Sequence, residues 1–385
     1  MKTIVLLTNI LTPYRQSFYD GLYAECKRKE VKFHILVMAE TERDRRWKYH
    51  ELEREYTELL EKKVYLGKTD SFYVNPNLIK KLEELKPDIL ILSGSYTLFP
   101  VWKALKWGKK QGCKIFFWSE SHLDEVRGFN KPVYMVREIV RKKFYRQFSG
   151  FWYPGVKAKE LIMKYADKDA TYIQVPNLIH NELFEKELGE ICATKEQIRD
   201  KYGLSRNKLI FFSPVRLIAV KGILPFLKEV AEMDFRDELQ IVIAGEGELE
   251  EEIREFVKTK ELSVILLGYR VREEIIENMY AADCFLLPSL SDPNPLACIE
   301  ALWCEKPLFV SEHVGNYPEV VAEGKNGYVF SYAKPDELRD KIELIVHKNR
   351  QWYEEAAKYS KQTAEKCFDT KKNCERIIEV LLNTD

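Results

Sequence analysis

The sequence has no net charge, no paired cysteine motif and no long apolar run. Its 385 residues carry a formal net charge of zero, so no overall electrostatic field favours a nucleic acid partner. The eight cysteines are scattered without a CxxC pair or a nearby histidine cluster, a pattern that suits a reducing compartment and predicts neither a disulfide framework nor a zinc site. No run approaches the ~18 apolar residues of a membrane-spanning helix. These absences predict a cytoplasmic protein of ordinary composition.

The first residues, MKTIVLLTNILTPYRQ, imitate a signal peptide only briefly. Their apolar run is very short and ends at Thr8 and Asn9, without a small-residue cleavage site. We therefore expect a buried first strand there.

Short apolar runs alternate with amphipathic stretches along most of the chain. The runs are KTIVLLTN, VKFHILVM, DILILSG, KIFFWS and TYIQVPN in the first half, and KLIFFSP, LQIVIAG, SVILLG, DCFLLPS and PLFVS in the second. Such alternation predicts parallel sheets with helices on both faces. The expected fold class is α/β, with two facing Rossmann-like, doubly wound domains and a central cleft.

The alternation restarts after a charged, helical stretch in the middle of the chain. We therefore expect an N-terminal domain over residues 1–180, a linker over 181–207 and a second domain over 208–360. The remaining residues, 361–385, are expected to form a C-terminal helix that packs back on the first domain.

The loops that follow the second-domain strands are the candidate site, because ligands bind beyond the carboxyl ends of parallel strands. Arg216 and Lys221 on the first loop suit a diphosphate, and an exposed basic loop is the equal alternative. The GxG of the second loop admits close backbone approach or is an ordinary turn. On the third loop, Tyr269 and Arg270 are expected either to flank a nucleobase or to pack against the protein itself. These residues are Arg216 and Lys221, then Gly245, Glu246 and Gly247, then Tyr269 and Arg270.

The fourth loop, SDPNPLACIEALWCEKP, places two acids around a helix start. Pro295 suits the first helical position, which makes Asn294 the expected N-cap. Asp292 then lies in the loop, and Glu300 lies about six residues inside the helix, roughly 9 Å along its axis. The alternative is that Asp292 supports the turn and Glu300 is a partly buried helix acid.

These loops together resemble one family. In order and spacing, VRLIAVKG, AGEGELEE, LGYRVREEIIENMYAADCFLLPSLSDPNPLACIEALWCEKPLFVS and VGNYPEVVAEGKNGYVF resemble the retaining glycosyltransferases of family 4, which have the GT-B fold. The resemblance covers most of residues 209–330 and is looser in the first domain. It implies transfer of a sugar from a nucleotide donor, a UDP-sugar, to a glycan or lipid-linked oligosaccharide of a cell-surface polysaccharide. It implies no cofactor and no metal.

The resemblance also implies roles for individual residues. Arg216 and Lys221 would hold the donor diphosphate and stabilise the charge of the leaving nucleotide. Glu300 would bind the ribose hydroxyls, and the Gly245 and Tyr269 loops would shape the nucleotide pocket. Glu319, after VGNYP, would have a supporting role.

The acidic motif departs from the family pattern of Glu followed by Gly-aromatic-Gly. This chain has Asp292, Pro293, Asn294 and Pro295 instead. Asp292 would take the place of the acid that contacts the donor sugar, with about 1.5 Å less reach. The two prolines lack a backbone N–H, which leaves those of three residues to meet the sugar, namely Asn294, Leu296 and Ala297. The departure therefore predicts an altered sugar pocket rather than a lost nucleotide site.

Two loops of the first domain are candidates for the acceptor side. Tyr14 and Arg15 follow the first strand where the family often has glycines. We expect them either to contact an acceptor or to have only a structural role in the loop. Glu120 and His122 follow KIFFWS, and family members often carry a histidine near the reacting sugar there. His122 is therefore the catalytic candidate, with a solvent-facing histidine as the alternative.

The stretch VREIVRKKFYRQF is expected to form a helix with Val136, Ile139, Val140, Phe144 and Phe148 on one side and cations around it. Such a helix suits peripheral contact with the inner face of the plasma membrane. Packing on the first sheet, with a solvated charged face, is the ordinary alternative.

Two rival functions remain open at this point. A nucleotide-sugar epimerase of GT-B-like fold would need no acceptor. A non-catalytic nucleotide-sugar-binding subunit, inactivated by the change in the acidic motif, would bind nucleotide and turn over no donor.

Overall fold

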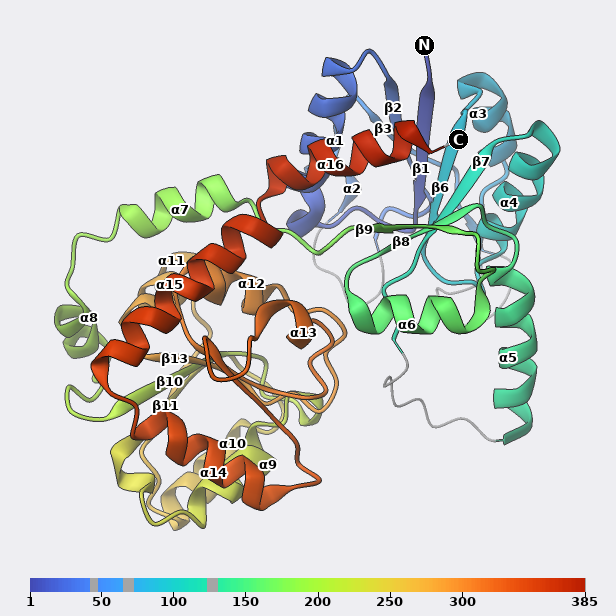
Figure 1. Cartoon of the computed structure of the whole chain (residues 1–385). Helices are drawn as coiled ribbons and strands as arrows, with labels where there is room; N and C mark the ends of the chain where they lie inside the picture. Colours follow the sequence, from blue (N-terminus) through green and yellow to red (C-terminus); the bar gives the residue numbers. More distant parts are fainter. Residues whose placement is uncertain (42–47, 65–72, 123–130, 385) are drawn as a thin grey trace. The chain divides into compact units, whose positions relative to one another are not determined.

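The computed structural model describes residues 1–41, 48–64, 73–122 and 131–384 (Figure 1). Residue contacts divide the chain into two compact units. Unit 1 comprises Met1–Leu178 and Thr370–Asp385, and unit 2 comprises Ile179–Asp369. Each unit contains its own parallel sheet, which confirms the expected pair of Rossmann-like α/β domains.

Unit 1 is built on a seven-stranded sheet in the order β3-β2-β1-β6-β7-β8-β9. Every pairing in it is parallel. All residues of β1 and β6 are buried, because helices cover both faces of the sheet. The strands are β1 (Thr3–Thr8), β2 (Lys32–Val37), β3 (Thr57–Leu59), β6 (Ile89–Ser93), β7 (Lys114–Trp118), β8 (Gly150–Tyr153) and β9 (Thr171–Gln174). A separate antiparallel pair joins β4 (Lys63–Val64) to β5 (Tyr73–Val74).

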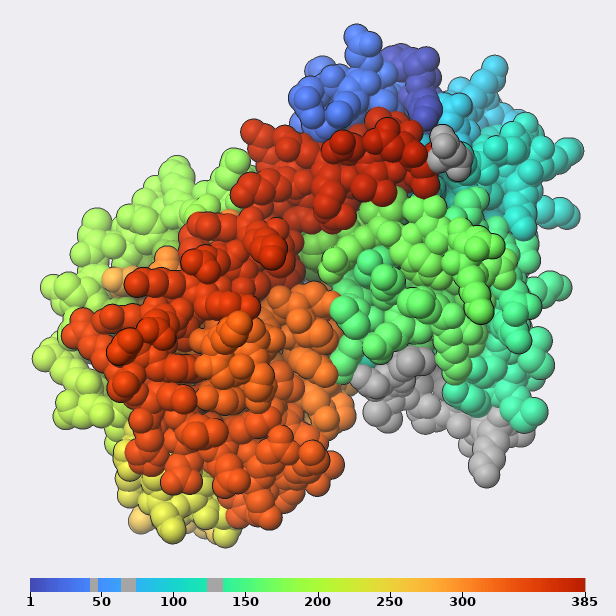
Figure 2. Space-filling model, in the orientation of Figure 1, coloured from blue at the N-terminus to red at the C-terminus, as the bar shows by residue number. Residues whose placement is uncertain are grey.

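The helices of unit 1 include the last helix of the chain, α16, which packs on α1 (Figures 1 and 2). Gly21 permits this approach, since a Cβ there would lie 2.7 Å from the Cys374 sulfur. The buried side chains of α16 include Ile377, Ile378 and Leu381. The helices are α1 (Gln16–Arg28), α2 (Tyr49–Leu52), α3 (Leu78–Leu85), α4 (Phe99–Gln111), α5 (Lys131–Tyr145), α6 (Val156–Tyr165) and α16 (Thr370–Asn383), with a 3-10 turn at Pro13–Arg15.

Unit 2 has a six-stranded parallel sheet in the order β12-β11-β10-β13-β14-β15. Its strands are β10 (Leu209–Pro214), β11 (Leu239–Ala244), β12 (Val264–Gly268), β13 (Cys284–Leu287), β14 (Leu308–Ser311) and β15 (Gly327–Phe330). Its helices are α7 (Asn181–Gly189), α8 (Lys195–Tyr202), α9 (Ile223–Ala231), α10 (Glu250–Thr259), α11 (Arg272–Ala281), α12 (Leu296–Trp303), α13 (Tyr317–Val320), α14 (Pro335–Val346) and α15 (Arg350–Cys367). The stretch expected as a linker, 181–207, thus contains α7 and α8 and belongs to unit 2.

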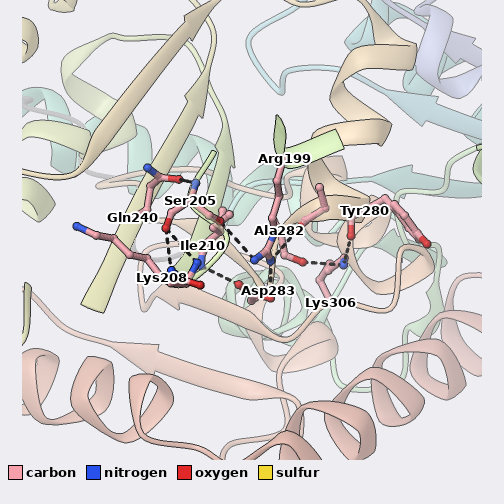
Figure 3. Close-up of polar contacts among 11 residues, drawn as sticks. Arg199, Ser205, Lys208, Ile210, Gln240, Tyr280, Ala282, Asp283 and Lys306 are labelled. Carbon is pink, nitrogen blue, oxygen red and sulfur yellow. Dashed lines mark hydrogen bonds and ion pairs between the residues drawn. The ribbon is translucent and has the colours of Figure 1, made fainter. Parts of the chain in front are cut away.

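A buried polar network lies at the amino ends of the unit 2 strands (Figure 3). The Arg199 guanidinium donates to the Asp283 carboxylate at 2.8 Å, just before β13. The Lys306 ammonium, just before β14, donates to the carbonyls of Tyr280 (2.7 Å) and Ala282 (2.8 Å). Burial lowers the pKa of Lys306 to about 8. We assign this network to stability, because ligands of parallel sheets bind at the opposite, carboxyl ends.

Within the described part of the chain, no helix combines the length and apolar character that crossing a bilayer requires.

Candidate donor site in unit 2

The strand order of unit 2 reverses between β10 and β13, and the loops after these two neighbours meet. The Leu290 amide donates to the Val220 carbonyl at 2.8 Å. The Tyr332 hydroxyl lies 3.0 Å from the Gly222 carbonyl oxygen and 2.8 Å from that of Pro288. Gly222 has φ +68°, and a Cβ there would lie 1.9 Å from the Pro288 oxygen, so only glycine fits. The contact therefore builds a fixed two-loop platform at the topological switch point, where doubly wound sheets bind ligands.

Two of the predicted site residues form an ion pair on this platform. Lys221, from the loop after β10, pairs with Asp292, from the loop after β13, at 2.5 Å. Their side chains are only 19% and 14% exposed. The Arg216 side chain is exposed, and no described residue forms an ion pair with its guanidinium. The platform thus presents one paired cation and one available cation at the same end of the sheet.

The glycines of the second loop permit close packing against the first loop. A Cβ on Gly245 would lie 2.0 Å from the Val215 oxygen, and one on Gly247 would lie 2.2 Å from the Leu217 oxygen. The Leu217 amide also donates to the Glu246 carbonyl at 2.9 Å. These contacts fix the backbone on both sides of Arg216.

The predicted helix start after Asp292 is wrong by one residue. Helix α12 begins at Leu296, and its N-cap is Pro295 rather than Asn294. Pro295 has ψ 128°, an extended conformation, and so it stands outside the helix. The N-cap therefore offers no side-chain hydrogen bond, and the amides of Leu296 and Ala297 lie in the first turn.

Glu300 is the fifth residue of α12 and forms an ion pair with Arg272, which was not among the residues predicted from the sequence. The Arg272 guanidinium lies 3.5 Å from the Glu300 carboxylate and 2.8 Å from that of Glu187 on α7. Burial raises the pKa of Glu300, whereas Arg272 opposes this rise. Arg272 stands in the already quoted LGYRVREE, close to two other candidates. No sequence motif pointed to Glu187, because its contact with Arg272 depends on where α7 packs.

The third loop lies beside the second. The Tyr269 side chain is 65% exposed, and its amide donates to the Glu246 carboxylate at 3.4 Å. Arg270 donates to the Tyr269 carbonyl at 2.8 Å and pairs with Glu274 at 3.8 Å. An exposed aromatic ring next to the glycine loop is therefore available for stacking.

The candidates of the first half lie in unit 1, at the carboxyl ends of β1 and β7. Arg15 and Glu120 form an ion pair, although sequence placed them on separate loops. The Arg15 guanidinium lies 4.4 Å from the centre of the Trp118 ring. Burial opposes its charge, but Glu120 raises the pKa of Arg15 above its ordinary value. Tyr14 is 37% exposed, whereas His122 is buried, contrary to a solvent-facing histidine.

Among the residues that the structure describes, no group of three or more His, Cys, Asp or Glu side chains is arranged to hold a metal ion.

Two parallel-sheet Rossmann-like domains, one with charged loops at its switch point, define the GT-B fold class. Residues 194–366, which lie within unit 2, match the family model described as Glycosyl transferases group 1. A structure of Anabaena Alr3699/HepE in complex with UDP is similar over 100% of both chains, with a TM-score of 0.73 and 16% identity. That level of identity shows the fold alone.

Two curated relatives match parts of the chain. An uncharacterized glycosyltransferase of Methanocaldococcus jannaschii is 32% identical over 127 residues, which are 32% of this chain and 35% of the relative. The UDP-Gal:alpha-D-GlcNAc-diphosphoundecaprenol alpha-1,3-galactosyltransferase of Escherichia coli is 32% identical over 166 residues, 41% of each chain. The match thus spans between a third and a half of the length of these relatives. Membership of family 4 and the retaining mechanism stay predictions.

Proposed function

We propose that this chain is a retaining, metal-independent glycosyltransferase that uses a UDP-sugar. Its acceptor would be a glycan or a lipid-linked oligosaccharide in cell-surface polysaccharide synthesis. The observation that carries the proposal is the Lys221–Asp292 pair beside Arg216 at the switch point of unit 2.

The geometry of this platform suits a nucleoside diphosphate sugar. A diphosphate carries two adjacent anionic groups, which Arg216 would bind in a fork and Lys221 as a point charge. Asp292, already in contact with Lys221, would then accept hydrogen bonds from the sugar next to the second phosphate. Glu300 would accept hydrogen bonds from the ribose, and Tyr269 would stack on the base.

The proposed reaction breaks the bond between the anomeric carbon and the diphosphate oxygen. The acceptor oxygen forms the new bond on the same face of the sugar, and its proton passes to the departing diphosphate. Arg216 and Lys221 would stabilise the negative charge that builds up on that diphosphate. No step in this scheme needs a metal, since the two cations supply the compensating charge. His122, Tyr14, Arg15 and Glu120 remain the acceptor-side candidates.

The relatives support the choice of donor and acceptor. The solved neighbour binds UDP, and the Escherichia coli relative is described as using UDP-Gal and a diphosphoundecaprenol-linked sugar. Both features are carried to this chain only as part of the proposal.

Calorimetric titration of the chain with UDP, GDP, ADP and TDP, without added metal, is the test. UDP should bind most tightly, and Arg216→Ala should weaken it by about 10-fold or more, the value of one charged hydrogen bond. Lys228→Ala, a change of another unit 2 lysine on α9, should leave binding unchanged. Failure of all four nucleotides to bind would refute the donor site.

Turnover separates the proposal from its rivals. With a UDP-sugar and lipid extract, the glycosyltransferase should release UDP and make a product whose anomeric configuration, read by NMR, matches the donor. An isomerised nucleotide sugar formed without acceptor would identify an epimerase instead. UDP binding without turnover of any donor would identify a binding subunit.

A further inference from the structure

Helix α5 of unit 1 exposes an unusual amount of apolar surface. Met135, Val136, Ile139 and Val140 are 65%, 60%, 67% and 37% exposed. Met135 and Ile139 are four residues apart, as are Val136 and Val140, and this spacing places all four side chains on one side of the helix. We call these four residues the α5 apolar face. Large apolar side chains clustered in this way mark an interaction site.

The other side of α5 is fixed to the body of unit 1. Phe144 and Tyr145 are buried in the core next to Phe148. Glu138 accepts a hydrogen bond from the Tyr165 hydroxyl of α6 at 2.6 Å, and Arg141 lies 3.6 Å from Glu138. The sequence-based expectation that Phe144 and Phe148 share one side with the apolar face is therefore wrong. They anchor the helix, and the apolar face points away from the core.

Two lysines extend the same outward side. Lys142 and Lys143 are exposed, and they lie three and four residues after Ile139, so they stand one turn along its face. No described residue forms an ion pair with either ammonium group. The exposed side of α5 thus has the α5 apolar face followed by an uncompensated cationic turn. In Figures 1 and 2 this helix lies at the margin of unit 1.

We propose that the exposed side of α5 docks on an anionic lipid bilayer. The α5 apolar face would enter the boundary between headgroups and acyl chains, and Lys142 and Lys143 would reach the lipid phosphates. Charge complementarity favours this occupant, because the two lysines need an anionic partner directly beside an apolar one. The proposal is independent of the glycosyltransferase proposal, since it concerns binding without substrate.

A second copy of the chain fits this surface less well. Antiparallel pairing of two α5 helices would place the lysines of each copy beside the α5 apolar face of the other. Parallel pairing would bring four lysines together, with like charges in direct opposition. Both arrangements bury charge without a counterion, which is unfavourable.

The test is co-sedimentation of the full chain with vesicles of phosphatidylglycerol and phosphatidylcholine, and with vesicles of phosphatidylcholine alone. The wild type should bind only the anionic vesicles, and added salt should weaken its binding. Ile139→Asp should reduce the partition coefficient about tenfold or more, because it removes apolar burial and adds a negative charge. Lys142→Glu/Lys143→Glu should have a similar effect through electrostatics alone.

Matched controls separate a local effect from a general one. Leu344→Asp changes a leucine that is 48% exposed on α14, and Lys80→Glu/Lys110→Glu makes the same charge change elsewhere in unit 1. Both should bind the vesicles like the wild type, and all variants should keep the urea unfolding midpoint of the wild type, which shows that they are folded. Equal binding of wild type and α5 variants would overturn the proposal. So would a chain that ignores vesicles but forms a dimer in sedimentation velocity that Ile139→Asp dissociates.

Discussion

The Lys221–Asp292 pair gives the sharpest test of the donor site, because its two members should respond in opposite ways. Lys221→Met removes a cation that we assign to the diphosphate. A charged hydrogen bond contributes about 1.5–3 kcal/mol, so the UDP dissociation constant should rise roughly 10- to 150-fold. Asp292→Asn keeps the shape of the side chain and removes a negative charge next to the same phosphate. UDP affinity should therefore stay the same or increase by up to about tenfold.

Stability should change in the same direction for both variants. The side chains are 19% and 14% exposed, which lies between a surface pair and a buried one. Loss of one partner should therefore destabilise the fold by about 1–3 kcal/mol, less than a fully buried pair. Lys341→Met is the matched control, since Lys341 is 18% exposed and is paired with Glu323 on the same unit. It should lower stability and leave UDP binding unchanged.

The assay is calorimetric titration of UDP and of UDP-sugars, with urea unfolding of the same samples. Asp292→Asn should lose the extra affinity that a correct sugar adds to UDP, because its carboxylate no longer accepts the sugar hydroxyls. The reasoning is refuted if Asp292→Asn weakens UDP as strongly as Lys221→Met does. That result would make the ion pair a structural link between two loops.

Three further outcomes follow from the structure. Lys306 has a pKa of about 8 instead of 10.5, so the unfolded chain binds more protons between these values and the unfolding free energy should rise with pH across this window. In urea unfolding, the Lys306→Met variant should lack this rise of about 3 kcal/mol. If the unfolding free energies of wild type and variant changed in parallel with pH, the lowered pKa of Lys306 would be wrong. Gly247→Ala, whose Cβ would meet the Leu217 oxygen at 2.2 Å, should weaken UDP in calorimetry, whereas unchanged affinity would mean that the loop adapts. Arg272→Met should raise the pKa of Glu300 further, so UDP binding should recover as pH increases; a flat pH profile would remove Glu300 from the site.

The fold was predictable where strands are long and strongly apolar. Strands β10 and β11 have six residues each and were recognised from their sequence alone. The short strands β3, β8 and β15, with three or four residues each, were not. Length alone does not explain the difference, because β9, β13 and β14 also have four residues and were recognised. Strand β3 is mostly polar (TEL), and β8 and β15 each begin with a glycine, so none of the three stands out as a continuous apolar run bounded by turn residues.

The site was predictable to the level of loops and not of contacts. Parallel strands put all their carboxyl ends at one edge, which is why Lys221 and Asp292, 71 residues apart, could be assigned to one place. The Arg272–Glu300 contact depends on the packing of two helices, which local pattern does not encode. Likewise α5 has apolar residues on both sides, so periodicity could not tell that Phe144 faces the core and Ile139 does not.

The prolines of the acidic motif are compatible with a rigid loop, because the amide that donates within this motif is that of Asp292, to the His313 carbonyl at 3.2 Å, and the other hydrogen bonds of its backbone use carbonyls. The Gly315 amide donates to the Asp292 carbonyl at 2.7 Å, and the Asn316 side chain donates to that of Pro295 at 3.0 Å. A Cβ on Gly315 would lie 1.8 Å from the Pro293 oxygen, so this loop has little room to move. The hydrogen bonds of this loop therefore need no amide donor from the two prolines, and under the proposed function the missing donors would affect only the contacts with the sugar. It follows that the nucleotide and sugar parts of the donor site are separable, and that affinity for UDP should survive changes in this loop that alter the choice of sugar.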